Sequence, residues 1–226
     1  MSRWEIRLAI ALIGAISASG FIETAQATTF SQAAEVTAVS ALSTLPVKGR
    51  APKTGYDREK LFGDWADPDG NGCDSRNDVL ARDLTNKVFG IGADKCLVLS
   101  GTLLDPYSGK SINFVRGQGT SSLVPIDHVV AVSEAWQKGA FKWDSAKRIN
   151  FYNDPLNLMT TQRSLNSQKS DGDAATWLPP LKSYRCTYVA RQIAVKVKYS
   201  IWVTKAEKDA MTRILASCPK QLLPSN

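Results

Sequence analysis

The 226-residue chain contains a single histidine, His128, so any chemistry that needs an imidazole must use this one side chain. Its four cysteines include no CxxC pair, which argues against a thiolate zinc site. It has no glycine-rich phosphate-binding loop, and its apolar run Leu8–Ile16 is shorter than the roughly 20 residues that a membrane span needs. These absences direct attention to His128 and its surroundings.

Residues 1–27 have the pattern of a secretory signal peptide, with a basic start, the apolar run and a small-x-small cleavage site that ends at Ala27. Cleavage after Ala27 would release a secreted, extracellular protein with no stable membrane association. An uncleaved anchor is the alternative, because Glu5 and Glu23 are unusual at the two ends of a signal peptide.

Composition divides the rest of the chain into three parts. Residues 28–53 are rich in Ala, Ser and Thr with weak periodicity, which predicts a flexible leader outside the fold. Residues 54–220 are long enough for a single domain with a hydrophobic core, and 221–226 form a short tail. We expect a monomer.

An even number of cysteines in a secreted chain predicts disulfides, and four cysteines allow three pairings. The order along the chain favours Cys73 with Cys96 and Cys186 with Cys218. Each of these pairs closes a loop within its own half of the chain.

Charge is distributed unevenly between the two halves. Residues 28–109 carry 9 Lys plus Arg against 11 Asp plus Glu, whereas residues 110–226 carry 17 against 8. The second half, which contains His128, therefore has a positive field that suits a polyanion such as nucleic acid. A basic surface that serves only solubility is the alternative.

Local patterns predict a mixture of helices and short strands. A short helix or turn is expected at 55–62 and a helix capped by Ser75 at 75–84, before a hairpin of strands 96–103 and 112–115. A strand at 123–132 precedes helices at 134–141 and 145–152. The last expected elements are a strand at 156–159, a helix after Thr160 or Thr161, a helix over 188–203 and a final helix opened by the capping box Thr204–Glu207.

His128 follows Asp127 at the centre of the expected strand. Asn157 lies where a second strand would pair with it, and Asn166 and Lys169 follow in the next expected helix. The order Asp-His, Asn and Asn-x-x-Lys at this spacing resembles the HNH nucleases of the ββα-metal (His-Me finger) group, with the last His of the motif replaced by Asn.

Other segments extend the resemblance to about residues 54–218. In their order they look like secreted bacterial HNH endonuclease family proteins related to the GmrSD C-terminal domain. The segments are Tyr56-Asp57-Arg58, Asn71 to Asn77, Leu99 to Thr102, Trp136 to Ala140, Asn153 to Leu158 and Trp177 to Pro180. The resemblance implies an α+β fold with a ββα-metal core at about 121–172, surrounding helices and a small N-terminal β-hairpin region.

Phosphodiester hydrolysis requires deprotonation of a water and neutralisation of charge on the phosphoryl and leaving oxygens. We expect His128 to be the general base. Asp127 and Asn166 offer hard oxygen ligands, which predicts one catalytic divalent cation, Mg²⁺ or Mn²⁺. The resemblance assigns Asn157 a supporting role, in which it bonds the backbone near His128 and holds this base in place.

Basic residues around this motif are candidates for substrate binding. Arg163 and Lys169 flank Asn166, and Arg58 belongs to the Tyr-x-Arg segment of the resemblance, so we expect these three near phosphates. Trp136 and Trp177 have apolar or proline neighbours and are expected in the core. Four more cations in the long segment between the two strands could follow the nucleic acid backbone: Lys138, Lys142, Lys147 and Arg148.

Residues 67–78 place oxygen side chains and a glycine as a calcium loop does, which suggests a structural Ca²⁺ held by Asp67, Asp69, Asn71 and Asp78. Asp78 replaces the usual bidentate Glu. The alternative is an Asp/Gly turn that leads into a helix capped by Ser75.

The expected function is a secreted, metal-dependent HNH endonuclease that cuts nucleic acid with low sequence specificity, since no base-reading element is visible. DNA is the first candidate substrate and RNA the second. The alternatives are a non-catalytic extracellular nucleic-acid-binding module and a nuclease toxin or effector, although the short leader leaves little room for a delivery domain.

Overall fold

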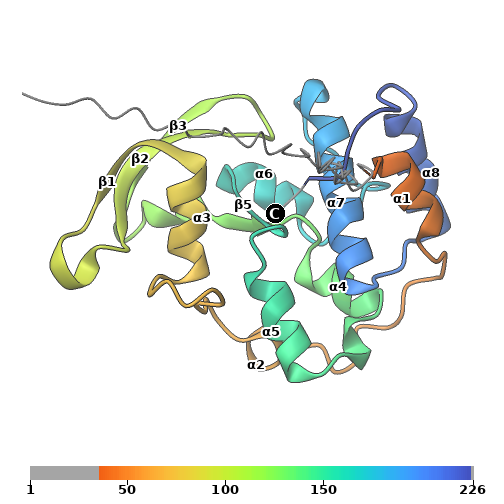
Figure 1. Cartoon of the computed structure of the whole chain (residues 1–226), viewed down its shortest axis with the longest axis horizontal. Coiled ribbons are helices and arrows are strands. Elements are labelled where there is room, and N and C mark those ends of the chain that lie inside the picture. The colour runs from red at the N-terminus through yellow and green to blue at the C-terminus, as the bar shows by residue number, and fades with distance from the viewer. Residues whose placement is uncertain (1–35, 225–226) are drawn as a thin grey trace, which may run out of the picture. The chain divides into compact units, whose positions relative to one another are not determined.

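The computed structural model describes residues 36–224, in which short antiparallel sheets are combined with helices (Figure 1). The predicted α+β class is therefore confirmed. The predicted signal peptide, 1–27, lies outside the described residues. None of the helices in the described part of the chain is long and apolar enough to cross a membrane.

A three-stranded sheet forms from β1 (Leu84–Phe89), β2 (Val98–Leu104) and β3 (Ser111–Val115). The predicted hairpin is present as β2 and β3, but β1 was not predicted. In β1 only the first residue, Leu84, is buried, so this strand lacks the apolar alternation that marks a half-buried strand.

Helix α3 (Ser75–Asp83) packs on this sheet through Leu80, which shares a core cluster with strand residues such as Phe114. Its N-cap is Asp74 and not Ser75 as predicted. The Asp74 carboxylate accepts a hydrogen bond from Asn77 N at 2.8 Å, whereas the Ser75 hydroxyl donates to the Asn153 side chain.

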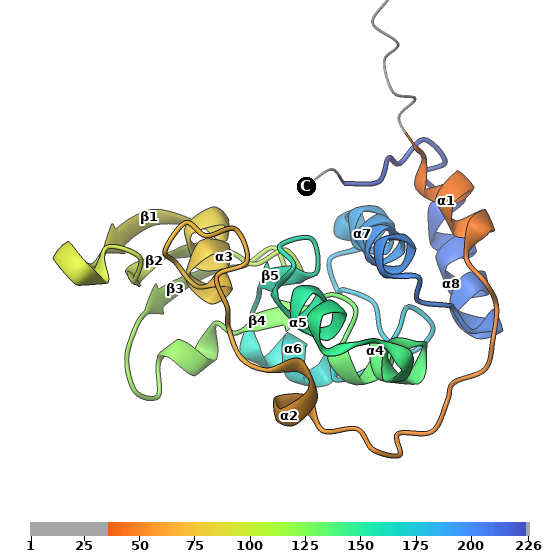
Figure 2. The same cartoon turned by 60° about the horizontal axis from the view of Figure 1, so that its bottom comes forward.

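A second, two-stranded sheet consists of β4 (Ile126–His128) and β5 (Leu158–Thr160), in which Asp127 is opposite Met159 and His128 is opposite Leu158. Both strands are shorter than predicted. Helices α4 (Val132–Gln137) and α5 (Ser145–Asn153) lie between them in the chain, and α6 (Arg163–Lys169) follows β5 directly. This order brings the end of β4 beside α6, as both views show (Figures 1 and 2).

Three helices lie together in Figure 1, on the side of the two-stranded sheet that is away from the three-stranded sheet. They are α7 (Arg185–Tyr199), α8 (Lys205–Leu215) and α1 (Ala38–Thr44). Helix α1 buries Ala38 and Leu42 in the same core cluster as residues of α7 and α8. The prediction of a flexible leader through residue 53 is thus wrong for the described residues from 36 onward. Small apolar side chains stabilise this helix only when they meet a tertiary partner, which composition does not reveal.

Residues 222 and 223, near the end of the described residues, are also part of the fold. A β-bridge joins Thr37 to Leu222, and Leu223 N donates to Val36 O at 3.0 Å. Within the predicted tail, Leu222 and Leu223 therefore pair with the segment before α1. A short helix, α2 (Arg58–Phe62), is present where a helix or turn was predicted.

Both favoured disulfides are present. Cys73–Cys96 joins the loop before α3 to the residues before β2, and Cys186–Cys218 joins the start of α7 to the turn after α8. Each bond therefore links segments that also pack together, α3 with β2 and α7 with α8.

Candidate active site

A cavity of about 440 Å³ opens where the end of β4, the start of α4, helix α6 and the residues around α2 meet. It brings together Asp127, His128 and Asn166, which the sequence placed in one motif. Arg58 also contributes to it, whereas Arg163, Lys169 and Asn157 do not line it. The other polar lining residues are Lys53, Tyr56, Ser133, Ser167, Ser170 and Asp171.

The His128 ring is buried and held in one orientation. Its Nε2 lies 2.8 Å from Tyr152 O, and because a carbonyl can only accept, Nε2 carries the proton in the neutral ring. Trp65 stacks on the ring with centroids 6.0 Å apart and an interplanar angle of 13°. Within residues 36–224, Nδ1 has no hydrogen-bond partner. Nδ1 is thus free to accept a proton.

Burial and charge keep this imidazole neutral. Desolvation is the main cause that lowers the pKa of His128 to about 3, and the positive charges of Arg58 and Lys169 lower it further. The hydrogen bond with Tyr152 O acts in the opposite direction. At neutral pH the ring therefore holds an unprotonated nitrogen next to the cavity.

Asp127 is 5% exposed and its carboxylate is bonded on both oxygens. Oδ1 accepts from Lys169 Nζ at 2.9 Å and Oδ2 accepts from Tyr107 OH at 2.6 Å. Lys169 Nζ also donates to His128 O at 2.8 Å. Lys169 was expected at the substrate surface, and this is wrong: its side chain is buried because it balances the charge of a buried carboxylate.

Helix α6 separates its polar residues by face. Asn166 and Lys169 are three positions apart and share the face toward β4. The Asn166 side chain lines the cavity and makes no hydrogen bond to another residue in 36–224. Arg163 lies on an exposed face, where it donates to Ser122 Oγ at 3.2 Å. The structure therefore places Asn166, and not Arg163, beside Asp127 and His128.

Asn157 is completely buried and contacts the backbone that follows His128. Its Oδ1 accepts from Val130 N at 2.8 Å and its Nδ2 donates to Val130 O at 3.3 Å. Asn157 O accepts from Val129 N at 2.8 Å. These bonds continue the pairing of the two strands beyond β4 and fix the turn that leads into α4.

Sequence reasoning missed Tyr107, Trp65 and Tyr152, which surround the Asp127-His128 pair. Tyr107 belongs to a segment that reads as an ordinary turn, yet its hydroxyl is buried against Asp127. Burial is the main cause that raises the pKa of Tyr107 well above its ordinary value, so it remains a hydrogen-bond donor. No local pattern marks these contacts, because each partner is remote in the chain.

Three buried carboxylates, Glu134, Asp173 and Glu207, lie close enough together to hold a metal ion. Two buried lysines and Arg50, which lies 2.8 Å from Asp173, already balance their charge. Lys138 Nζ lies 2.8 Å from both Glu134 and Asp173, and Lys196 Nζ lies 2.9 Å from Glu207. The cluster is thus an internal ion-pair network, and the expectation that Lys138 follows nucleic acid is wrong, because this side chain is inaccessible.

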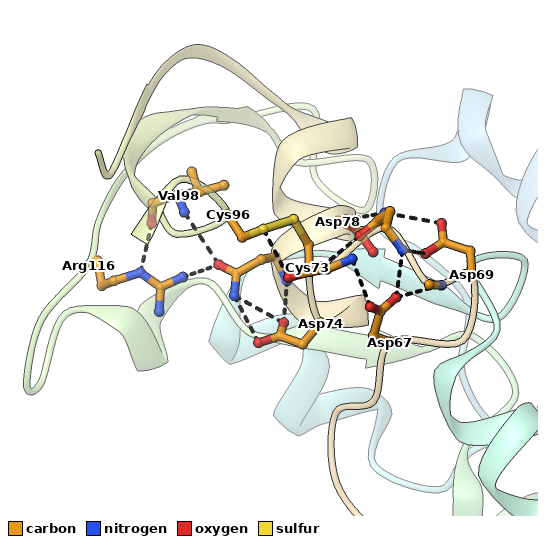
Figure 3. The surroundings of a disulfide bond; sticks show 12 residues. Asp67, Asp69, Cys73, Asp74, Asp78, Cys96, Val98 and Arg116 are labelled. Carbon is orange, nitrogen blue, oxygen red and sulfur yellow. Dashed lines mark hydrogen bonds between the residues drawn. A yellow bond between two sulfur atoms is a disulfide. The ribbon is translucent and has the colours of Figure 1, made fainter. Parts of the chain in front are cut away.

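The loop proposed for calcium is closed by its own hydrogen bonds, beside the Cys73–Cys96 bond (Figure 3). Asp67 accepts from the backbone N of Gly70 and Gly72 at 2.9 and 2.8 Å, and Asn71 Nδ2 donates to Asp69 at 3.1 Å and to Asp78 at 3.2 Å. These bonds describe an Asp/Gly turn, and calcium binding remains only a prediction.

Comparisons with known proteins found a family and a relative of this chain. Residues 74–214 match the family "GmrSD restriction endonucleases, C-terminal domain", which is more than half of the chain. An "Uncharacterized secreted protein" of the fungus Arthroderma benhamiae (strain ATCC MYA-4681 / CBS 112371) is 40% identical over 185 residues, covering 80% of this chain and 85% of its own. No solved structure matches. A fungal relative does not support the expectation of a bacterial group, but the chain belongs to the GmrSD restriction endonuclease C-terminal domain family.

Proposed function

We propose that the protein is a secreted, metal-dependent endonuclease that hydrolyses phosphodiester bonds of nucleic acid with little sequence preference. The observation that carries this proposal is the shared cavity of Asp127, His128 and Asn166 in a ββα arrangement of β4, β5 and α6. The family match supports a nuclease, and the relative's printed description supports secretion.

His128 is the general base in this proposal. Its Nε2–H is held by Tyr152 O, so the ring presents Nδ1 to a water in the cavity. The water gives a proton to Nδ1 as its oxygen attacks the phosphorus, the bond between phosphorus and the leaving oxygen breaks, and that oxygen takes up a proton from solvent water. The stack with Trp65 prevents the ring from turning away, and Asn157 fixes the turn after His128. Asn157 is therefore a positioning residue.

Asp127 and Asn166 would hold the divalent cation. The Asn166 amide oxygen is uncommitted within residues 36–224, and each Asp127 oxygen accepts only one of the two hydrogen bonds for which it has lone pairs. Hard oxygen donors with space for water suit Mg²⁺ or Mn²⁺. When bound, the ion would neutralise charge on the phosphoryl and leaving oxygens.

Arg58 is the substrate-binding residue that the cavity retains from the predicted set. Its guanidinium lies over the Tyr152 ring at 5.3 Å and donates to Tyr152 OH at 3.2 Å. It forms no ion pair with a carboxylate among residues 36–224, so its charge is available to a phosphate. Contacts of this kind read the backbone and not the bases, which agrees with low sequence specificity.

A plasmid assay tests the proposal. Purified protein is incubated with supercoiled plasmid and with RNA in Mg²⁺ or Mn²⁺, and EDTA and His128→Ala serve as controls. We expect nicking that EDTA abolishes and that His128→Ala reduces at least about 100-fold, with partial recovery in added imidazole. Intact substrates in both metals over a range of pH would contradict the enzymatic function.

A further inference from the structure

Residues 46–57 connect α1 to α2 as an extended segment, here called the strap, which is fixed against the helices. Ala51 N donates to Gln137 O at 2.8 Å, and Trp202 Nε1 donates to Gly49 O at 3.0 Å. Figure 2 shows the strap in orange, passing along the α4 side of the domain before it reaches α2. Since backbone and side-chain bonds anchor it, the strap presents its side chains in defined positions.

The strap and the first residue of α2 carry four cations in two different states. Arg50 and Lys53 form ion pairs with Asp173 and Asp171, at 2.8 and 2.6 Å. Lys48 and Arg58 form none with residues of the described chain and lie instead over aromatic rings. Two positive charges at the ends of the strap are therefore uncompensated.

A row of aromatic rings connects the cavity to the far end of the strap. Tyr56 lines the cavity and lies 5.9 Å from Trp136, centroid to centroid. Trp136 is 6.3 Å from Phe141, and Phe141 is 6.3 Å from Trp202. The row therefore leads from the catalytic cavity over α4 and the 3-10 turn Ala140–Lys142 to the residues before α8.

Each ring of this row beyond Tyr56 carries a cation. Arg148 lies 5.3 Å from the Trp136 centroid, and Lys142 lies 5.4 Å from that of Phe141. Lys48 lies 5.3 Å from that of Trp202. These three cations form no ion pair within residues 36–224, and ring contacts orient them without cancelling their charge.

The acidic side chains near this row already accept hydrogen bonds from the N-termini of helices. Asp57 and Asp144 accept hydrogen bonds from the N-termini of α2 and α5, at 3.1 and 2.8 Å. Trp136 is 6% exposed and offers almost no surface to a ligand, whereas Phe141 and Trp202 are half-buried and keep accessible surface. A fixed row of cations with accessible aromatic rings is the combination by which proteins hold single-stranded nucleic acid.

We propose that the strap and this ring row form a strand-binding extension of the active-site cavity. It would bind the phosphate backbone through Lys48, Lys142 and Arg148, beyond the bond that is cut, and it would prefer unpaired strands because Phe141 and Trp202 stack only on exposed bases. This inference rests on the proposed nuclease function and adds a substrate subsite to it.

Binding of labelled single-stranded oligonucleotides about 6 and about 20 nucleotides long tests the extension. Fluorescence anisotropy is measured in EDTA, so that no cleavage occurs, for the wild type and the double variant Lys48→Met/Lys142→Met. Methionine keeps the apolar stem on the ring and removes the charge. The matched control is Lys182→Met/Lys220→Met, which removes two exposed cations outside the cavity and the strap.

We expect the wild type to bind the long strand more tightly than the short one. The double variant should lose about tenfold in affinity for the long strand, and its log–log salt slope should fall by about 1.4, at about 0.7 for each lost phosphate contact. The control should lose neither. Equal behaviour of the two variants, or no advantage of the long strand in the wild type, would overturn the extension. Plasmid cleavage by the same wild-type preparation would show that the proposed function nevertheless stands.

Discussion

The ammonium of Lys169 lies 2.9 Å from Oδ1 of Asp127, and both side chains are buried beneath the candidate active site. The same ammonium reaches His128 O at 2.8 Å. One lysine thus ties helix α6 to the end of β4 at the residue that would serve as base. The pair gives Asp127 a structural role in addition to its proposed role at the cation.

Removal of Lys169 alone should therefore destabilise the fold strongly. We expect Lys169→Met to lower the free energy of unfolding by about 3–5 kcal/mol, because it leaves the Asp127 carboxylate buried without its partner. The double variant Asp127→Asn/Lys169→Met should recover part of this loss. Urea unfolding measures both, with Lys182→Met as the exposed-lysine control. Equal midpoints for Lys169→Met and the control would show that the pair contributes little.

Replacement of Asn166 should affect the cation and not the fold. Its side chain is half-buried and makes no hydrogen bond within residues 36–224, so Asn166→Ala should change the unfolding free energy by less than about 1 kcal/mol. We expect the Mg²⁺ concentration for half-maximal cleavage to rise about tenfold or more. Gln168→Ala, on the exposed side of α6, is the matched control. A lower rate at an unchanged Mg²⁺ requirement would remove Asn166 from the cation site.

Acid should weaken the fold through Asp173. Burial by itself raises the pKa of this carboxyl, but the charge and hydrogen bond of Lys138 and the hydrogen bond of Arg50 outweigh it and lower the pKa to about 2. The folded pKa is below the ordinary value of 3.8, so the contribution to stability is present above about pH 4 and is lost as the pH falls toward 2.

The contribution is about 2 kcal/mol at neutral pH. We expect the free energy of unfolding of the wild type to fall more steeply between pH 4 and pH 2 than that of Asp173→Asn, as followed by urea titrations at each pH. Parallel pH profiles for the two proteins would show that Asp173 is not the group responsible.

Much of the architecture follows from local sequence. Helix α8 begins at the predicted capping box, in which Glu207 N donates to Thr204 Oγ at 3.1 Å, and both favoured disulfides are present. The resemblance to HNH nucleases likewise implied that β4, β5 and α6 bring Asp127, His128 and Asn166 to one cavity. Capping and cysteine order can be read along the chain even where the joined residues, such as Cys186 and Cys218, are 32 positions apart.

The errors concern contacts between remote segments. Lys169 reads as a surface cation because charge is normally solvated, and only its burial against Asp127 reveals an ion pair. Tyr107 reads as a turn residue until its hydroxyl is seen 2.6 Å from the same carboxylate. Strand β1 was not predicted because its residues after Leu84 are exposed. Helix α1 was not predicted because its small side chains have no strong period.

The sequence by itself indicated the class of fold, favoured the cysteine pairing that is present and marked the residues of the candidate motif, through capping, alternation and the resemblance to a known family. Tertiary structure alone decided which charges are buried, which nitrogen of His128 is free, and that residues 46–57 are an anchored strap and not part of a leader. The physical reason is that burial and desolvation are properties of the packed molecule. The chain neighbours of Lys138 and Lys169 do not mark either lysine as buried, and only the neighbours in space show that these two stabilise the core whereas Lys142 is exposed.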